Sequence, residues 1–180
     1  MNVLIASVLK RIEFDIKDNN VDLKIQAGIP MVRCDRIKIS EVILNLINNA
    51  IKFSSKNEKE SPRVEVGYED KGNFHKFYVR DNGIGIDPKY HNQVFGIFKR
   101  LHTAKEFEGT GAGLSIVKRV IDDHKGKLWI ESEAGKGATF LFTIPKEIDG
   151  VKNKKIGELL IEDGLITKEQ LDEKLKKQEG

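Results

Sequence analysis

The chain has 180 residues, and its 31 lysine and arginine residues nearly balance its 28 aspartate and glutamate residues. The resulting formal charge of +3 is too small to indicate a nucleic-acid partner. No apolar run approaches the roughly 18 residues of a membrane span, and no signal sequence opens the chain. Cys34 is the only cysteine, which excludes an internal disulfide. We therefore expect a soluble, cytoplasmic domain that makes no contact with a membrane.

The first 80 residues predict alternating helices and strands. Apolar periodicity places a helix at 1–13, a strand at 21–27, a helix from 35 to about 53, and paired strands at 63–69 and 74–80. Asp35 is a residue type that caps helices. The apolar residues of the second helix recur at helical spacing, so we expect that helix to bury one face.

The second half begins with a long stretch, residues 81–113, that has glycines at both ends and little clear periodicity. So long a connection inside a domain is typical of a lid or a binding loop. A helix at 114–124 and strands at 127–133 and 138–144 are predicted to follow it. The remaining residues predict a linker at 147–155 and a helical appendage at 156–180, whose second helix opens with a capping-box pattern.

Four polar residues of the helix at 35–53 share one face, because spacings of four, four and three residues return to the same side. They are Glu41, Asn45, Asn49 and Lys52. Asparagine is a poor helix former, and this set is suited to bind an ion and phosphates together. A solvated polar face is an equally open alternative.

Two glycine-rich segments lie at the ends of the long stretch. Asp81 follows a strand directly, and a buried aspartate accepts a hydrogen bond from an exocyclic amine such as that of adenine. Gly83 and Gly85 let the backbone approach a flat ring, although a tight turn is the alternative. The run from Gly109 to Leu114 leads into a helix, where free N–H groups favour phosphate. Alone it is weak evidence, since it is neither a dinucleotide fingerprint nor a P-loop.

Phe95 and Phe98 lie between these segments at a spacing that would attach a mobile segment to the core. Lys99 and Arg100 would then lie over a phosphate site. Two phenylalanines at this spacing are more often ordinary core residues, so the pair alone decides nothing.

The order of these segments resembles that of the ATP-binding catalytic domain of sensor histidine kinases, within the GHKL ATPase superfamily. The matching segments are I-L-N-L-I-N-N-A-I-K-F (43–53) for the N box, D-N-G-I-G-I-D (81–87) for G1, F-G-I-F (95–98) for the F box and G-T-G-A-G-L (109–114) for G2. The details F-K-R-L-H and A-I-K-F are most similar to the phytochrome-like branch. The resemblance covers about residues 1–146.

The resemblance implies an α/β fold, a two-layer α/β sandwich of the Bergerat type. A mixed, mostly antiparallel sheet is then covered by helices on one face, with a short C-terminal helical hairpin added. It also implies that residues 1–146 are the catalytic domain of a two-component sensor histidine kinase. Such a domain binds Mg-ATP and donates the γ-phosphoryl group to a histidine on a separate domain.

The resemblance also implies catalytic roles for Asn45, Asn49 and Arg100. Asn49 is expected to be a ligand of Mg²⁺, which bridges the ATP phosphates. Asn45 stands where gyrase- and Hsp90-type ATPases have a glutamate that activates water. Because an asparagine cannot act as that base, hydrolysis is expected to be slow and ATP kept for transfer. Arg100 is expected to stabilise the charge of the γ-phosphate.

The other expected nucleotide contacts divide between adenine and the phosphates. Phe53 is expected to pack near adenine, Asp81 to receive its amine, and Gly83 and Gly85 to shape the pocket. The phosphates are expected to contact Lys52, Lys99, Arg100, Gly109, Gly111, Gly113 and the Leu114 N–H. Ile86 and Thr110 complete the expected cofactor-binding set.

Two residues depart from the family pattern. Ala112 stands where a larger aliphatic residue is common, a change that would loosen the G2 turn. Glu41 stands where glutamine is frequent. Its charge would repel phosphate unless it faces away or meets Lys38 or Lys52.

No histidine lies in the phosphoacceptor context of the family, and we expect all four to be ordinary surface residues. They are His75, His91, His102 and His124. The dimerisation and phosphoacceptor domain is therefore expected upstream in the same full-length protein, with residues 1–12 as the junction. A response-regulator receiver domain is the indirect partner, and the isolated domain is expected to be a monomer.

Residues 156–178 are similar to one motif of the N-terminal domain of type II secretion and type IV pilus assembly ATPases, in which paired copies bind cyclic di-GMP. A single copy is equally consistent with a two-helix docking appendage. The alternative function is therefore a non-catalytic module for nucleotide binding or second-messenger docking. A serine kinase of the anti-sigma type is disfavoured by the phytochrome-like lid and flanking residues.

Overall fold

The structure, a computed structural model, describes residues 1–57, 60–96, 111–146 and 167. The chain divides into two units, Met1–Lys146 and Glu147–Gly180, and all of the described helices and strands belong to the first. The predicted linker and the predicted helices at 156–180 lie outside the described residues, apart from Thr167.

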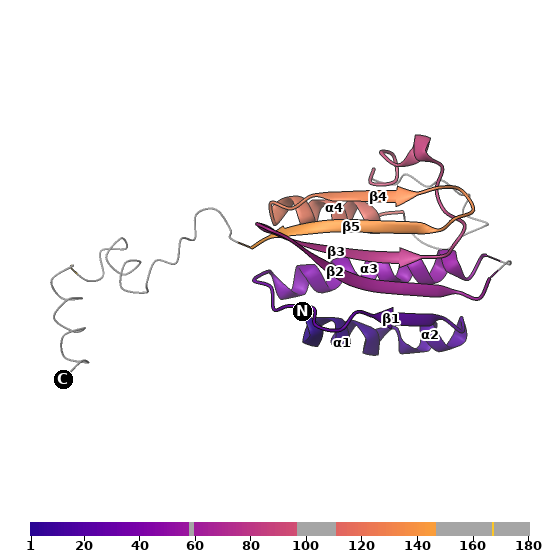
Figure 1. Ribbon diagram of the computed structural model, residues 1–180, viewed down its shortest axis with the longest axis horizontal. Helices are drawn as coiled ribbons and strands as arrows, with labels where there is room; N and C mark the ends of the chain where they lie inside the picture. Colours follow the sequence, from indigo (N-terminus) through magenta and orange to yellow (C-terminus); the bar gives the residue numbers. More distant parts are fainter. Residues whose placement is uncertain (58–59, 97–110, 147–166, 168–180) are drawn as a thin grey trace. The chain divides into compact units, whose positions relative to one another are not determined.

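Five strands form one sheet in the order β1-β2-β3-β5-β4 (Figure 1). They are β1 (Asp22–Ile25), β2 (Arg63–Lys71), β3 (Phe74–Asp81), β4 (Leu128–Ser132) and β5 (Ala138–Pro145). β1 and β2 pair in parallel, whereas the other neighbours are antiparallel. This is the mixed, mostly antiparallel sheet that the family resemblance implies.

The helices supply the second layer. They are α1 (Asn2–Arg11), α2 (Glu13–Asp18), α3 (Arg36–Ser54) and α4 (Gly113–Asp123), with a short 3-10 turn η1 at Pro88–Tyr90. Figure 1 shows α3 and α4 on the same face of the sheet, and α1 packs against α3. The two-layer α/β sandwich is therefore confirmed.

The predicted cap and apolar face explain where α3 begins and how it packs. Asp35 Oδ1 accepts hydrogen bonds from the backbone N–H groups of Ile37 and Lys38, at 3.0 and 3.1 Å. These two bonds satisfy donors that the first turn of a helix leaves unpaired. The buried face consists of Ile39, Val42, Ile43, Leu46, Ile47, Ala50 and Ile51. Beside it, α3 carries the polar residues of the N-box pattern.

Alternation along β3 directs every second side chain toward the helices. Phe77 and Val79 are 3% and 1% exposed, and Phe77 stacks on Phe142 of β5 with ring centroids 5.2 Å apart. Fully burying such a side chain contributes roughly 1.5–3 kcal/mol. Asp81 follows in the same alternation, so the strand places a carboxyl group on the inward face at its last position.

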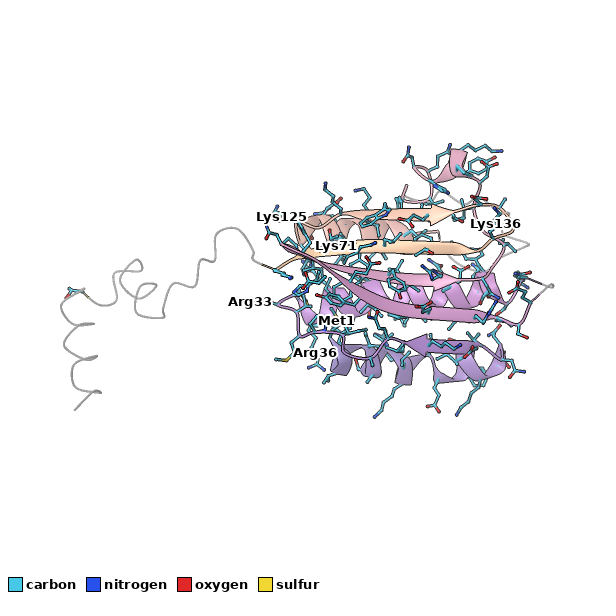
Figure 2. The ribbon with its side chains drawn as sticks, in the orientation of Figure 1. Met1, Arg33, Arg36, Lys71, Lys125 and Lys136 are labelled. Atoms are coloured by element: carbon cyan, nitrogen blue, oxygen red, sulfur yellow. The ribbon has the colours of Figure 1, made fainter. Side chains whose placement is uncertain are left out.

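The two ends of the sheet are distinct. Figure 2 shows Lys71 at one end, where β2 turns into β3, and Lys136 at the other end, in the turn between β4 and β5. Asp81 lies at the second end, because it pairs with Ala138, the first residue of β5.

The predicted helix at 1–13 is two helices in the structure. Ile12 lies between them with φ −115° and ψ 14°, outside the helical region, and it is 2% exposed. Its side chain is buried like the apolar residues of α1, so apolar spacing alone does not indicate the break.

Candidate functional site

The N-box asparagine Asn45 contacts the beginning of α4. Its Nδ2 donates a hydrogen bond of 2.8 Å to the backbone carbonyl of Glu41, one turn earlier on α3. A Cβ atom added to Gly113 would lie 2.6 Å from Asn45 Oδ1, closer than real Cβ contacts allow. The N box and the G2 segment, nearly 70 residues apart in the chain, therefore meet at a position where any side chain larger than that of glycine would displace the Asn45 amide.

The other end of α3 contacts the G1 turn. Gly83 is buried, and a Cβ atom there would lie 2.5 Å from the backbone oxygen of Phe53. Asn45 and Phe53 are eight residues apart on one helix, or about 12 Å along its axis. Asn49 and Lys52 lie between them, both half-buried, and the Lys52 ammonium lies 5.3 Å from the centre of the Phe53 ring.

Asp81 is a buried carboxyl group with one occupied oxygen. It is 6% exposed, and its Oδ1 accepts hydrogen bonds from the backbone N–H groups of Gly83 (2.8 Å) and Ala138 (3.3 Å). Among the described residues, none donates to Oδ2, and no fully buried side-chain oxygen or nitrogen lacks a partner. Oδ2 therefore keeps some solvent access and is an acceptor suited to a ligand N–H group.

Burial controls the protonation of this carboxyl group. Removal from water raises the pKa of Asp81 to about 6, and the two backbone hydrogen bonds, which favour the carboxylate, offset only part of that rise. At neutral pH the group is mostly ionised although its side chain is nearly buried. A donor that reaches Oδ2 therefore gains a charge-assisted hydrogen bond.

The rest of the G1 turn is fixed by the β4–β5 turn. Gly85 has φ +66°, and a Cβ atom there would overlap the backbone oxygen of Glu133. Ser132 Oγ accepts a hydrogen bond from the Ile86 N–H at 2.8 Å and donates one of 2.7 Å to the Gly137 carbonyl. Through these contacts the turn that carries Gly83, Gly85 and Ile86 is attached to a second loop.

Several of these positioning residues are not predicted from the sequence. Ser132 and Gly137 lie in a segment predicted only as a strand end and a turn, yet Gly137 packs against the backbone of Asp81. Asn82 belongs to the G1 motif, but the motif gives it no role. Its Oδ1 accepts from the Arg63 N–H at 2.8 Å, and its carbonyl accepts from the Asn57 side chain at 2.5 Å. The A-G-K-G sequence signals a turn, but nothing in it signals which loop the turn touches.

Beyond Asn49, Lys52, Gly85 and Ile86, described above, the predicted residues are placed as follows. Contacts bring together Asn45 with Gly113, and Phe53 and Asp81 with Gly83. Gly111, with φ +72°, precedes α4, and Leu114 packs partly buried against the core. Lys99, Arg100, Gly109 and Thr110 lie outside the described residues.

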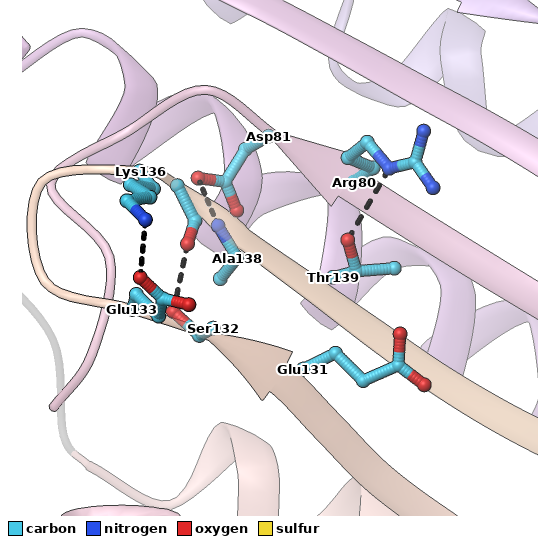
Figure 3. A pocket seen from close by; sticks show the side chains of 9 residues that line it. Arg80, Asp81, Glu131, Ser132, Glu133, Lys136, Ala138 and Thr139 are labelled. Carbon is cyan, nitrogen blue, oxygen red and sulfur yellow. Dashed lines mark hydrogen bonds and ion pairs between the residues drawn. The ribbon is translucent and has the colours of Figure 1, made fainter. Parts of the chain in front are cut away.

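A hollow of about 280 Å³ lies near the G1 turn (Figure 3). Its side chains come from the ends of β3, β4 and β5 and from the turn between the last two. They are Arg80, Asp81, Glu131, Ser132, Glu133, Lys136, Ala138 and Thr139. Figure 3 shows Lys136 facing Glu133 and Arg80 facing Thr139, so these polar groups already have partners. The hollow shares only Asp81 with the residues predicted to bind a nucleotide.

The described residues suit a nucleotide better than a metal held by protein ligands alone. Within residues 1–57, 60–96 and 111–146, no group of three or more His, Cys, Asp or Glu side chains is placed to hold a metal ion. Mg²⁺ commonly takes one or two protein oxygens and fills its other positions with phosphates and water. Asn49, half-buried on α3 between Asn45 and Phe53, is a candidate for one such protein oxygen.

None of the helices in the described part of the chain is both long enough and apolar enough to cross a membrane.

Comparison with known proteins gives a consistent set of relatives. Residues 34–148 match the family described as histidine kinase-, DNA gyrase B-, and HSP90-like ATPase. The cyanobacterial phytochrome B of Nostoc sp. is 44% identical over 146 residues, which cover 80% of this chain and 19% of the phytochrome. The chain therefore spans about a fifth of the length of this curated relative.

Solved structures match over most of the described chain. The nucleotide-free catalytic domain of histidine kinase ThkA has a TM-score of 0.69 and 32% sequence identity, covering 81% of this chain and 92% of that one. ThkA in complex with the response regulator protein TrrA matches with a TM-score of 0.65 and 27% identity, covering 82% and 40%.

Proposed function

The chain belongs to the histidine kinase-, DNA gyrase B-, and HSP90-like ATPase family, and on that premise we propose that it binds Mg-ATP for phosphoryl transfer to a histidine. It is an ATP-binding module homologous to histidine kinase catalytic domains. The proposal assigns the phosphoacceptor histidine to a separate dimerisation domain of the full-length protein, joined through residues 1–12. We further propose that residues 1–146 form the catalytic domain and that it works in the cytoplasm as a monomer.

Asp81 is the residue that carries the proposal. Its Oδ2 is an anionic acceptor with solvent access, next to the Gly83 backbone that packs on Phe53. The exocyclic amine of adenine is the nucleotide group that matches a buried carboxylate. In this proposal Phe53 and Ile86 contact the purine, and Gly83 and Gly85 leave room for it.

The proposed phosphate subsite lies toward Asn45. Asn49 would hold Mg²⁺ through its amide oxygen, and the ion would supply positive charge that neutralises the phosphates. Lys52 and the backbone N–H groups at the start of α4, from Gly111 to Leu114, would contact phosphate oxygens. Lys99, Arg100, Gly109 and Thr110 remain part of the proposed subsite.

Asn45 determines what the bound nucleotide is used for. Its amide donates to the Glu41 carbonyl, and an amide does not take a proton from water. Hydrolysis is therefore slow, and the γ-phosphoryl group is kept for a histidine. In the transfer, a bond forms between an imidazole nitrogen and the γ-phosphorus while the bond to the β–γ bridging oxygen breaks, so that ADP leaves. A response-regulator receiver domain then takes the phosphoryl group from the histidine.

The test combines binding with transfer. Calorimetry on the full chain is expected to detect Mg-ATP and ADP, and Asp81→Asn is expected to abolish that binding while the fold is kept. Mixing the chain with its upstream domain and radiolabelled ATP is expected to yield acid-labile phosphohistidine. Lack of nucleotide binding by the folded wild type would refute the proposal. Binding without transfer would leave the alternative, a non-catalytic module for nucleotide or second-messenger docking.

The segment at 156–178 calls for a separate measurement. It lies beyond the matched family region, and its resemblance to the secretion and pilus ATPase motif stays a proposal. Titration with cyclic di-GMP distinguishes the ligand site that this resemblance suggests from a docking appendage, because only the former binds the dinucleotide.

A further inference from the structure

Glu41 forms an ion pair that the sequence pattern does not indicate. Its Oε1 lies 2.9 Å from Nη1 of Arg11, the last residue of α1. Lys38, one of the two lysines considered for this role, pairs instead with Asp123 at 3.6 Å. The charge of Glu41 is thus balanced from the N-terminal helix.

Glu41 lies one helical turn before the proposed phosphate subsite. Its carbonyl accepts the hydrogen bond from the Asn45 amide, and Asn45 in turn contacts Gly113. Along the axis of α3, Glu41 is about 6 Å from Asn45 and about 12 Å from Asn49. The shorter of these separations lies within the roughly 10 Å over which charges interact at ordinary ionic strength, so the Glu41 charge acts on the phosphates of a nucleoside triphosphate bound near Asn45, most strongly at low salt.

We propose that Arg11 is a positioning residue for the phosphate subsite, acting by neutralising Glu41; this inference rests on the proposed nucleotide-binding function. The two side chains are 53% and 43% exposed, so their pairing contributes little to folding. The ion pair instead changes the electrostatic potential at the proposed phosphate subsite. With Arg11 present, the turn of α3 around Glu41 carries no net charge, as it would if position 41 held the glutamine that is frequent in the family.

The inference predicts a specific pattern of affinities. Arg11→Gln exposes the Glu41 charge and is expected to weaken Mg-ATP binding roughly threefold to tenfold at low salt. Adenosine has no phosphate, so its affinity is expected to stay the same. Glu41→Gln removes the charge itself, and in that background Arg11→Gln is expected to have no further effect on Mg-ATP.

Lys10→Gln is the matched control, because Lys10 is exposed, adjacent on α1, and loses the same formal charge. It separates the pairing with Glu41 from a general change in net charge. Melting curves for all variants check that each one is folded.

The experiment is calorimetry of the full wild-type chain, the Arg11→Gln, Glu41→Gln and Lys10→Gln variants and the double variant. Each is titrated with Mg-ATP and with adenosine, at low and at high salt. The expected result is a salt-sensitive loss of Mg-ATP affinity in Arg11→Gln alone. An equal loss in Lys10→Gln, in the Glu41→Gln background or with adenosine would overturn the inference. A folded wild type that binds neither ligand would instead refute the proposed function.

Discussion

Asn45 of α3 and Gly113 of α4 touch so closely that a single added methyl group would displace one of them. The ideal Cβ position of residue 113 is 2.6 Å from Asn45 Oδ1, which is held in place because Nδ2 of the same amide donates to Glu41. The contact joins the two helices that cover the same face of the sheet. Substitution of Gly113 tests whether this contact matters for function, because the Asn45 side chain is able to move aside while the protein stays folded.

Gly113→Ala is expected to weaken nucleotide binding without unfolding the protein. The new methyl group pushes the Asn45 amide aside and breaks its hydrogen bond to Glu41. We expect affinity to fall roughly fivefold to tenfold, the equivalent of one lost hydrogen bond. Stability is expected to change little, because the roughly 1 kcal/mol by which alanine favours a helix over glycine offsets a lost hydrogen bond of similar size. Calorimetry with Mg-ATP and urea unfolding measure the two effects.

The control for this variant is Asn45→Ala, which removes the side chain that the methyl group meets. The loss from Gly113→Ala should shrink in that background. Gly28→Asn serves as a distant comparison, because Gly28 has φ +75° and open space around it, and asparagine tolerates that backbone. Equal losses in both backgrounds would contradict the contact as the cause.

Asp81→Asn is expected to separate stability from nucleotide binding. Burial raises the folded-state pKa of Asp81 from 3.8 to about 6. Because the folded-state pKa is the higher one, the protonated carboxyl group contributes fully to stability below pH 3.8. That contribution is lost as the pH rises through about 6. At neutral pH the ionised group therefore costs about 3 kcal/mol, and the amide avoids this cost. The amide oxygen of the variant still accepts from the two N–H groups, but its nitrogen cannot accept from adenine.

Urea unfolding at pH 4.5 and pH 7.5 measures the difference in free energy of unfolding between the wild type and Asp81→Asn. The variant should be more stable than the wild type at pH 7.5, and the difference in their free energies of unfolding should be smaller at pH 4.5. Nucleotide affinity of the wild type should decline as the pH falls through about 6, because the protonated carboxyl no longer accepts fully. A pH-independent gap in stability would show that burial of the charge is not responsible.

The sequence predicts local features of the site well and long-range contacts poorly. Asp35 and the apolar spacing of α3 act within a few residues, so the cap, the helix and its polar face are all foreseeable. Asp81 is foreseeable as a strand-end carboxylate, since strand alternation fixes its side. Arg11 and Glu41 are 30 residues apart, and Ile86 and Ser132 are 46 apart. Such pairs depend on how elements pack, which spacing along the chain does not encode.

Ser132→Ala is expected to loosen the G1 turn. The hydroxyl group joins the Ile86 N–H to the Gly137 carbonyl, and alanine leaves both without that partner. We expect the free energy of unfolding to fall by about 1–3 kcal/mol, the net contribution of two hydrogen bonds. Nucleotide affinity should fall too, since Gly83 and Gly85 lie on the same turn. Ser7→Ala, which removes a local bond within α1, is the control, and equal effects from both variants would contradict this assignment.

His124→Ala is expected to lower stability while leaving nucleotide affinity nearly intact. Contrary to the expectation of an ordinary surface residue, His124 bridges two helices. Its Nε2 accepts from the Asp35 N–H at 3.1 Å, and its Nδ1 lies 2.8 Å from the Val120 carbonyl, which fixes the hydrogen on Nδ1. Loss of both bonds should cost about 1–2 kcal/mol.

Asp122→Ala on the same helix is the comparison for His124→Ala. Asp122 makes an exposed i,i+4 pair with Lys118, and such a pair contributes at most about 0.5 kcal/mol. His124 contacts Asp35, the N-cap of α3, which lies ten residues before Asn45, or about 15 Å along the helix. A melting temperature that falls by a few degrees in His124→Ala alone, with unchanged Mg-ATP affinity, would establish the bridge as structural. A large loss of affinity would instead mean that the register between α3 and α4 is set at this end and transmitted to Asn45.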